Sequence, residues 1–131
     1  MSINNQGQVT GAAALSGNQI FHPFLWTRKT GMVDLGVLDG DADGAGLGIN
    51  NWGDIVGASV TSPGPASGNP RAFVWHKGHM NDLNALIPAN SSMYLLTAFS
   101  INDEGQIAGF GVVISGPDAG NIHGFLATPK F

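Results

Sequence analysis

One nine-residue phrase occurs three times in this chain, and it limits the possible folds more than any other feature. The copies read INNQGQVTG at residues 3–11, INNWGDIVG at 49–57 and INDEGQIAG at 101–109. They recur after 46 and then 52 residues. Self-similarity at this spacing is typical of repeated units of a few strands each, which cannot bury both of their faces alone.

The centre of each phrase, Asn-Asn-x-Gly or Asn-Asp-x-Gly, predicts a tight turn. Asn and Asp bond to their own backbone, and Gly adopts positive φ without steric cost. We therefore expect Ile49 to end a strand, residues 50–53 to turn and residues 54–60 to return as the hairpin partner. The equivalent return strands are expected at 8–15 and 106–114. A glycine at a fixed offset inside each return strand predicts a bulge or a close approach of another backbone.

Two further phrases predict the remaining strands. A short aromatic strand is expected after each variable loop. A segment of alternating apolar and polar residues is expected after the first two aromatic strands. The aromatic strands are 22–26, 71–75 and 123–127, the loops are 16–20, 61–70 and 115–121, and the alternating segments are 32–38 and 80–87. Runs preceding the second and third turns, 45–49 and 94–101, are also strand-like. No segment keeps a helical period for three turns.

The predicted fold class is therefore all-β, with three tandem four-stranded antiparallel repeats in one repeat domain of 131 residues. The repeats span about 1–44, 45–93 and 94–131, the last lacking its final strand, so about eleven strands are expected.

Composition excludes several classes of partner. The net charge is −4 with five basic residues, so neither nucleic acid nor an anionic membrane surface is expected as a partner. There is no cysteine, which excludes disulfides and thiolate metal sites. No signal peptide is visible in residues 1–20, and no apolar run reaches the length of a membrane span.

Taken together, the phrases resemble the HAF repeat of bacterial extracellular repeat proteins, over residues 2–128. The first copy carries His22, Phe24 to Trp26, and Met32 to Leu38, while the second has Arg71 in the His slot and Asn84 in a Gly slot. The resemblance implies a β-propeller-like fold, an extracellular or periplasmic location, and no catalytic residues. The protein's own location is not indicated by its residues.

Three repeats are fewer than the roughly four blades that a closed propeller needs. Two chains could form a six-bladed ring, each start supplying a strand to the other's end, or the chain could be a fragment of a longer protein. We expect the homodimer, because open sheet edges and apolar blade faces promote association. A threefold β-trefoil or β-prism, monomeric and lectin-like, is the alternative architecture.

One acidic segment matches the opening of a calcium loop. Asp39, Asp41 and Asp43 alternate ahead of Gly44, as in the oxygen ligands that Ca²⁺ prefers. The twelfth position is Asn50 rather than a bidentate Glu, and residues 88–93 of the next repeat contain no acid. A solvated acidic turn is the favoured interpretation, and no cofactor is expected unless these three aspartates bind calcium.

The best candidate for a ligand-binding residue is Trp52. It occupies a turn slot where the other copies have Gln6 and Glu104, and an aromatic side chain there suggests a contact surface for a glycan or protein. Trp26 and Trp75, at equivalent positions, are expected in the core between repeats.

His22, Arg71 and His123 occupy equivalent positions at the start of the three aromatic strands. Because Arg is a poor metal ligand, we expect polar side chains that bond to the backbone of the adjoining repeat.

No catalytic constellation or nucleotide-binding loop is visible. The sequence therefore favours a non-enzymatic structural or interaction module. The resemblance implies a binding module of bacterial origin. A carbohydrate-binding module is the alternative, and a hydrolase with its residues on the loops is favoured least.

Overall fold

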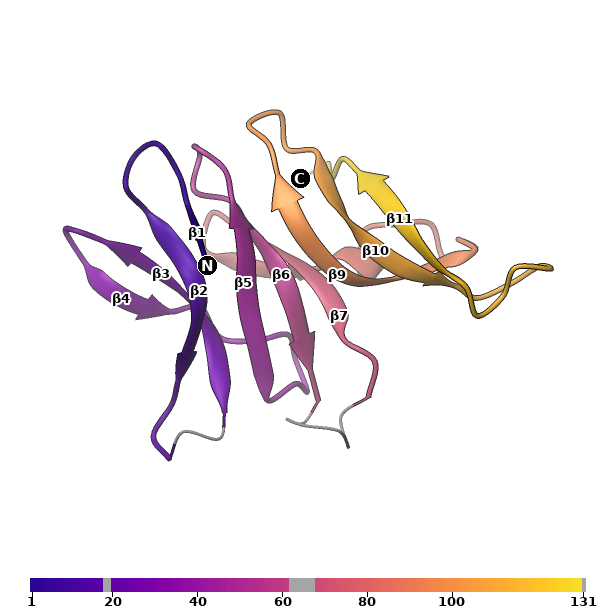
Figure 1. Ribbon diagram of the computed structural model, residues 1–131, viewed down its shortest axis with the longest axis horizontal. Helices are drawn as coiled ribbons and strands as arrows, with labels where there is room; N and C mark the ends of the chain where they lie inside the picture. The colour runs from indigo at the N-terminus through magenta and orange to yellow at the C-terminus, as the bar shows by residue number, and fades with distance from the viewer. Residues whose placement is uncertain (18–19, 62–67, 131) are drawn as a thin grey trace.

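In the computed structural model, the chain forms three antiparallel β-sheets arranged in a row (Figure 1). Residues 1–17, 20–61 and 68–130 are described by the structure. Within them there are eleven strands, one 3₁₀ turn and no α-helix, so the prediction of an all-β antiparallel fold is confirmed. The sheets are open, with four, four and three strands. In the described part of the chain, no helix is long and apolar enough to cross a membrane.

Each sheet is built from strands that follow one another along the chain. The first comprises β1 (Ser2–Ile3), β2 (Val9–Ala14), β3 (Phe21–Thr27) and β4 (Gly31–Asp34). The second comprises β5 (Asp43–Ile49), β6 (Ile55–Val60), β7 (Arg71–His76) and β8 (His79–Asp82). The third comprises β9 (Met93–Ile101), β10 (Ile107–Val113) and β11 (Ile122–Ala127), in the order β11-β10-β9. The predicted strand order within each repeat is therefore correct.

The repeated phrase forms the predicted turns. In the second copy, Oδ1 of Asn50 accepts hydrogen bonds from the backbone N–H groups of Trp52 and Asp54, at 3.0 and 2.9 Å. The Asn50 carbonyl accepts from the N–H of Gly53, whose φ is 83°. The first and third copies repeat these contacts, so the Asn side chain and the Gly conformation together close each turn.

The glycine inside the return strand marks a close backbone approach in the second and third repeats, as predicted, whereas Gly11 of the first repeat faces only the side chains of Met1 and Phe24. A Cβ atom on Gly57 would collide with the carbonyl oxygen of Ala45 on β5 and lie 2.9 Å from the Phe73 ring on β7. The β5–β6 register shifts between Gly46 and Gly48, which brings this carbonyl inward. Glycine is needed here because an aromatic ring and a bulged strand share the space that a side chain would fill.

The fourth strands are shorter than predicted. β4 ends at Asp34 rather than Leu38, and β8 ends at Asp82 rather than Ile87. The 3₁₀ turn η1 (Leu83–Ala85) follows β8, and the Asp82 side chain caps it by accepting from the N–H of Asn84 at 2.9 Å. The capping hydrogen bond gives the backbone an alternative to the strand ladder, which the alternating pattern did not reveal. Of the predicted loops, residues 18–19 and 62–67 lie outside the described part of the chain.

Every sheet has two unlike faces, set by the alternation of side chains along its strands. The tryptophan face is defined by the register pairs Val9–Trp26, Ile55–Trp75 and Ile107–Ala127. The aliphatic face is defined by Thr10–Leu25, Val56–Val74 and Ala108–Leu126. These names are used below for all three sheets.

The core lies between the sheets, where one aliphatic face covers one tryptophan face. Leu25 of the first sheet packs against a buried cluster around Ile55 and Phe73 of the second. Val56 and Val74 of the second sheet pack against Ile107 and its neighbours in the third. The repeats therefore stack in one direction, and each sheet uses its aliphatic face on the next sheet along the chain.

This stacking places the two equivalent tryptophans differently. Trp75 packs against the cluster between the first and second sheets, as expected. Trp26 lies on the tryptophan face of the first sheet, which no other sheet covers, and its side chain is 38% exposed. The expectation of a core position therefore holds for Trp75 but not for Trp26.

Candidate functional site

The three Asn turns lie next to one another along one rim and are joined by a ladder of hydrogen bonds. Nδ2 of Asn4 donates to the carbonyl oxygen of Asn50 at 2.9 Å, and Nδ2 of Asn50 donates to that of Asn102 at 3.0 Å. The other hydrogen of each amide bonds within its own turn, to the side chain of Gln8 or Asp54. Asn4 and Asn50 thus each shape their own turn and bind the next one.

A second rung of the ladder uses the following residue of each turn. The N–H of Asn5 donates to Oδ1 of Asn51 at 2.7 Å, and the N–H of Asn51 donates to Oδ1 of Asp103 at 2.8 Å. The amide of Asn51 also donates to Oδ2 of Asp103 at 2.8 Å. Because both Asp103 oxygens accept hydrogen bonds from Asn51, the pKa of this carboxyl is lowered from its ordinary value.

Trp52, the predicted ligand-binding residue, lies on the same rim. Its indole Nε1 donates to the carbonyl oxygen of Asp103 at 2.9 Å, so the ring leans towards the third turn. The residue is nevertheless 77% exposed. One edge of the indole is therefore fixed while most of its surface remains available to a ligand.

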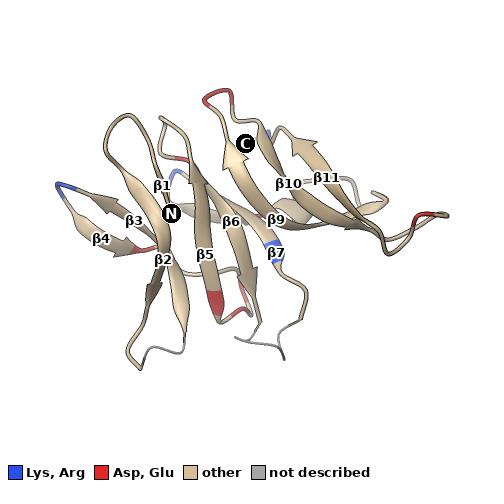
Figure 2. Ribbon diagram, in the orientation of Figure 1, with Lys and Arg blue, Asp and Glu red and all other residues tan. Residues whose placement is uncertain are grey.

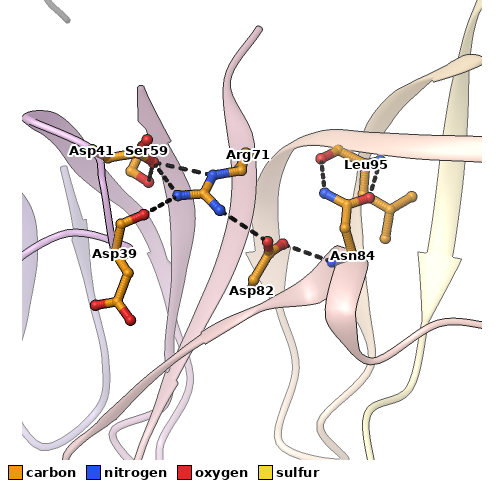
Figure 3. Close-up of polar contacts among 7 residues, drawn as sticks. All are labelled: Asp39, Asp41, Ser59, Arg71, Asp82, Asn84 and Leu95. Atoms are coloured by element: carbon orange, nitrogen blue, oxygen red, sulfur yellow. Dashed lines mark hydrogen bonds and ion pairs between the residues drawn. The ribbon is translucent and has the colours of Figure 1, made fainter. Parts of the chain in front are cut away.

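A second polar network, centred on Arg71, crosses the second sheet (Figure 3). The guanidinium lies 3.1 Å from Oδ2 of Asp41 and 3.3 Å from Oδ2 of Asp82, and Nη2 donates to the carbonyl of Asp39 at 2.7 Å. Burial acts to lower the pKa of Arg71, but the Asp41 hydrogen bond and the two carboxylate charges raise it overall. Ser59 also donates to Asp41. Arg71 thus fastens the connection between the first two sheets.

The network continues into the third sheet. Asp82, bonded to Arg71, also accepts from the backbone of Asn84. The Asn84 side chain then makes a two-way contact with Leu95 on β9, donating to its carbonyl at 2.9 Å and accepting from its N–H at 2.7 Å (Figure 3). The Arg71 network is accordingly a clamp between sheets, in which the guanidinium is already surrounded by acceptors.

The three predicted calcium ligands are held by different partners. Asp41 is paired with Arg71, Oδ1 of Asp43 accepts from the N–H of Phe21 at 2.6 Å, and Asp39 enters the Arg71 network through its carbonyl only. Oδ1 of Asp41 is buried without a hydrogen-bond partner. Within the described residues, no group of three acidic, His or Cys side chains is arranged to hold a metal ion. Calcium binding at these aspartates stays a prediction.

His22 and Arg71, which occupy the same position of the repeat, each contact an aspartate of their own sheet. Nδ1 of His22 lies 2.9 Å from Oδ1 of Asp34, and Arg71 lies 3.3 Å from Asp82, at the equivalent place. The prediction of backbone contacts with the adjoining repeat is therefore wrong for His22 and incomplete for Arg71. Strand pairing explains this result, because it brings the start of the aromatic strand beside the end of the following strand.

The two outer faces of the row are mainly apolar, and no other sheet covers them. β2 and β3 of the first sheet and β10 and β11 of the third contain no Lys, Arg, Asp or Glu, and Figure 2 shows charged residues mainly on turns and strand ends. β4 adds one carboxylate to the outer tryptophan face, because Asp34 pairs with Phe24 and lies beside His22. Met32 on the outer tryptophan face is 57% exposed, and Leu126 on the outer aliphatic face is 70% exposed. Val74, the repeat equivalent of Leu126, is fully buried.

The outer tryptophan face is also hollowed. A hollow of about 230 Å³ is lined by Phe24, Met32, His22, Asp34 and neighbouring residues of β2 and β3. The outer aliphatic face carries Ile122 and a contact between the Phe99 and Phe110 rings, whose centroids are 5.3 Å apart. These two faces, with the Asn rim, are the candidate binding surfaces.

Comparison with protein-family models, with curated proteins and with solved structures gave no match. The candidate surfaces therefore stand on the geometry of this chain alone.

Sequence reasoning found the turns, singled out Trp52 and expected apolar faces that promote association, but it missed the ladder. The recurrence of Asn4, Asn50 and Asn102 was the available signal for the ladder. From the sequence, this recurrence was explained by turn formation alone. Turn formation uses the side-chain oxygen and one amide hydrogen of each Asn, so the second amide hydrogen can bond to a neighbouring turn.

Proposed function

We propose that this chain is a non-enzymatic interaction module, built as a partial β-propeller of the HAF-repeat kind, that binds a macromolecular partner through its two outer sheet faces. One observation carries the proposal. Inside the chain each aliphatic face is covered by a tryptophan face, while one face of each kind is left uncovered at the ends of the row.

The composition of the outer faces supports this function. Contiguous exposed apolar surface on a folded protein marks an interaction site more often than scattered apolar residues do. Leu126 lies on β11, which has no charged residue, and Met32 lies on β4 opposite Trp26 of the uncharged β3. Both residues are more than half exposed. Their equivalents in the second sheet, Val74 and Met80, take part in the internal stacking.

Strand pairing supports a propeller-like arrangement over a trefoil. Every register pair joins strands of the same repeat, and contacts between repeats are made by sheet faces and turns. A trefoil would require strands of different repeats to share a barrel. Stacked four-stranded sheets joined face to face are the unit of a propeller.

Hydroxyl-radical footprinting of the unmodified chain tests this function. The purified chain is oxidised alone in dilute solution and with saturating protein or oligosaccharide partners, and oxidation of individual side chains is read by mass spectrometry. A protein partner should protect Trp26, Met32 and Leu126 and leave Trp52 reactive. Binding of a protein partner without protection of either outer face would contradict the proposal.

A carbohydrate-binding module is the second candidate, and the position of Trp52 favours it. The indole is fixed by its bond to Asp103 and is mostly exposed, as a stacking platform for a sugar ring requires. In the same footprinting experiment, an oligosaccharide ligand should protect Trp52 and leave Trp26 reactive. A glycan array that stays silent for the wild type would remove this candidate.

A further inference from the structure

The Asn ladder has two unlike ends, and their unused groups are complementary. At the third turn, Asn102 donates one amide hydrogen to Gln106 at 2.8 Å, and the other hydrogen has no acceptor in the described part of the chain. The N–H of Asp103 is likewise without an acceptor there. Their equivalents, Asn50 and Asn51, use these hydrogens to bind the next turn.

The first turn offers the matching acceptors. The carbonyl of Asn4 accepts only from the N–H of Gly7 within the described residues, whereas the carbonyl of Asn50 accepts both from its own turn and from Asn4. Oδ1 of Asn5 accepts no hydrogen bond there, whereas Oδ1 of Asn51 accepts from Asn5. The third turn thus ends in two donors and the first turn begins with two acceptors.

The apolar faces end in the same complementary way. The outer aliphatic face of the third sheet carries Leu126 at the position equivalent to Val74. Val74 lies on the aliphatic face of the second sheet, which packs on the third sheet. The outer tryptophan face of the first sheet carries Trp26 and Met32. Their equivalents Trp75 and Met80 lie on the tryptophan face of the second sheet, against which Leu25 packs. Both internal contacts join these two kinds of face in the same order along the chain.

We propose that the partner of the outer faces is a second copy of this chain, bound head to tail. The aliphatic face around Leu126 of one copy packs on the tryptophan face around Met32 of the other. Asn102 and the N–H of Asp103 donate to the first turn of that copy, as Asn50 and Asn51 donate within the chain. The inference rests on the proposed function, since it requires that the outer faces bind, and it names what they bind.

The same contact made twice gives a closed dimer of six sheets, because a contact between unlike surfaces forms a ring when its rotation closes. β1 pairs with β2 of its own sheet. The copies therefore join through faces and turns, without the strand exchange that the sequence suggested.

Paired substitutions test the contact. Leu126→Asp disables one aliphatic face and Met32→Asp disables one tryptophan face, and each places an unpaired charge in the contact. The wild type should associate reversibly to twice the 13.5 kDa of one chain, as measured by sedimentation equilibrium. Each variant alone should associate about 100-fold more weakly or less, since an unpaired buried charge is costly.

Mixing the two variants distinguishes a head-to-tail contact from a symmetric one. The mixture retains one contact between intact faces, so it should form a 1:1 dimer where each variant alone is monomeric. Val33→Asp, which changes an exposed apolar residue next to Met32 but on the opposite face of β4, should associate as the wild type does. Asn102→Asp, which keeps the turn acceptor but removes the amide donor, should weaken association about tenfold.

Four results would overturn the inference: a wild type that stays monomeric, a face variant that associates normally alone, a mixture that stays monomeric, or a Val33→Asp loss of association equal to that of Met32→Asp. Normal association of Asn102→Asp would overturn the role of the ladder in the contact. A monomeric wild type whose Trp26 and Leu126 are protected by another protein would remove the second copy as partner and keep the proposed function.

Discussion

At the scale of single residues, one side-chain type performs two tasks in this protein. The oxygen of Asn50 closes its own turn, and its amide links this turn to Asn102. The residue is 3% exposed, so loss of the amide would leave a carbonyl at the rim without its partner. An Asp at the same position could close the turn but could not donate to the next one.

Asp103 shows how the ladder affects ionisation. Hydrogen bonds from the side chain and backbone of Asn51 stabilise the carboxylate and lower its pKa below the ordinary value of 3.8. Because the folded pKa is lower than the unfolded one, the contact stabilises the fold above the ordinary pKa. This contribution is lost as the pH falls through the folded value.

We predict that Asn51→Ala raises the pKa of Asp103 towards its ordinary value, because the side-chain donor is lost. The measurement is an NMR titration of the Asp103 carboxyl carbon in the wild type and in the variant. The titration midpoint should lie higher in Asn51→Ala. Equal midpoints would show that Asn51 does not stabilise the charged form.

At the scale of elements, the hairpin is the repeated unit, and its turn sets where the strands begin and end. The first two turns link to the turn of the following repeat, so a distorted turn disturbs a neighbouring sheet as well as its own. The third turn is the best place to separate the two effects, because among the described residues its contacts to another repeat are with the preceding one.

We predict that Gly105→Val lowers the free energy of unfolding by about 1–3 kcal/mol, because a β-branched residue resists positive φ. Gly105 has φ 81°, and no atom lies within 4 Å of the place where its Cβ would stand, so crowding adds nothing.

Gly105→Asn is the matched control, since Asn tolerates this conformation better. It should retain most of the stability in urea denaturation. If Val and Asn proved equally stable at this position, the turn would not depend on the left-handed conformation.

At the scale of the whole molecule, the three sheets repeat one structure in three different environments. The second sheet is covered on both faces, and Ile55, Phe73 and Val74 on its strands are fully buried. The first and third sheets are covered on one face only. Equivalent residues therefore contribute differently to the stability of the isolated chain.

We predict that Val74→Asp lowers the free energy of unfolding by about 3–5 kcal/mol in dilute solution, because it buries an unpaired carboxylate. Leu126→Asp at the equivalent position should change it by about 0.5 kcal/mol or less, since the side chain there is exposed. Urea denaturation at low protein concentration measures both. A large loss for Leu126→Asp would place this face in the core of the single chain.

Much of the fold was predictable because it depends on local chemistry. The Asn-x-Gly turns, the glycine of each return strand and the aromatic strands all leave residue patterns at fixed spacing. The early end of β8 was not predictable, because the cap that Asp82 makes competes with an alternation that still reads as strand. Among the candidate sites, the exposure of Trp52 was predictable because the other repeats have Gln6 and Glu104 at this position. Its hydrogen bond to Asp103 was not predictable, because it joins residues 51 positions apart.

The sequence alone determined that the chain is a row of like hairpin units, since turns and strand alternation follow from neighbouring residues. Only the tertiary structure decided which unit covers which. Leu25, Val74 and Leu126 are equivalent in sequence, and their burial differs because stacking has a direction and a row has two ends. The same physical reason separates Asn50, whose amide reaches the next turn, from the solvent-exposed Asn102, and it leaves one face of each kind without a covering sheet.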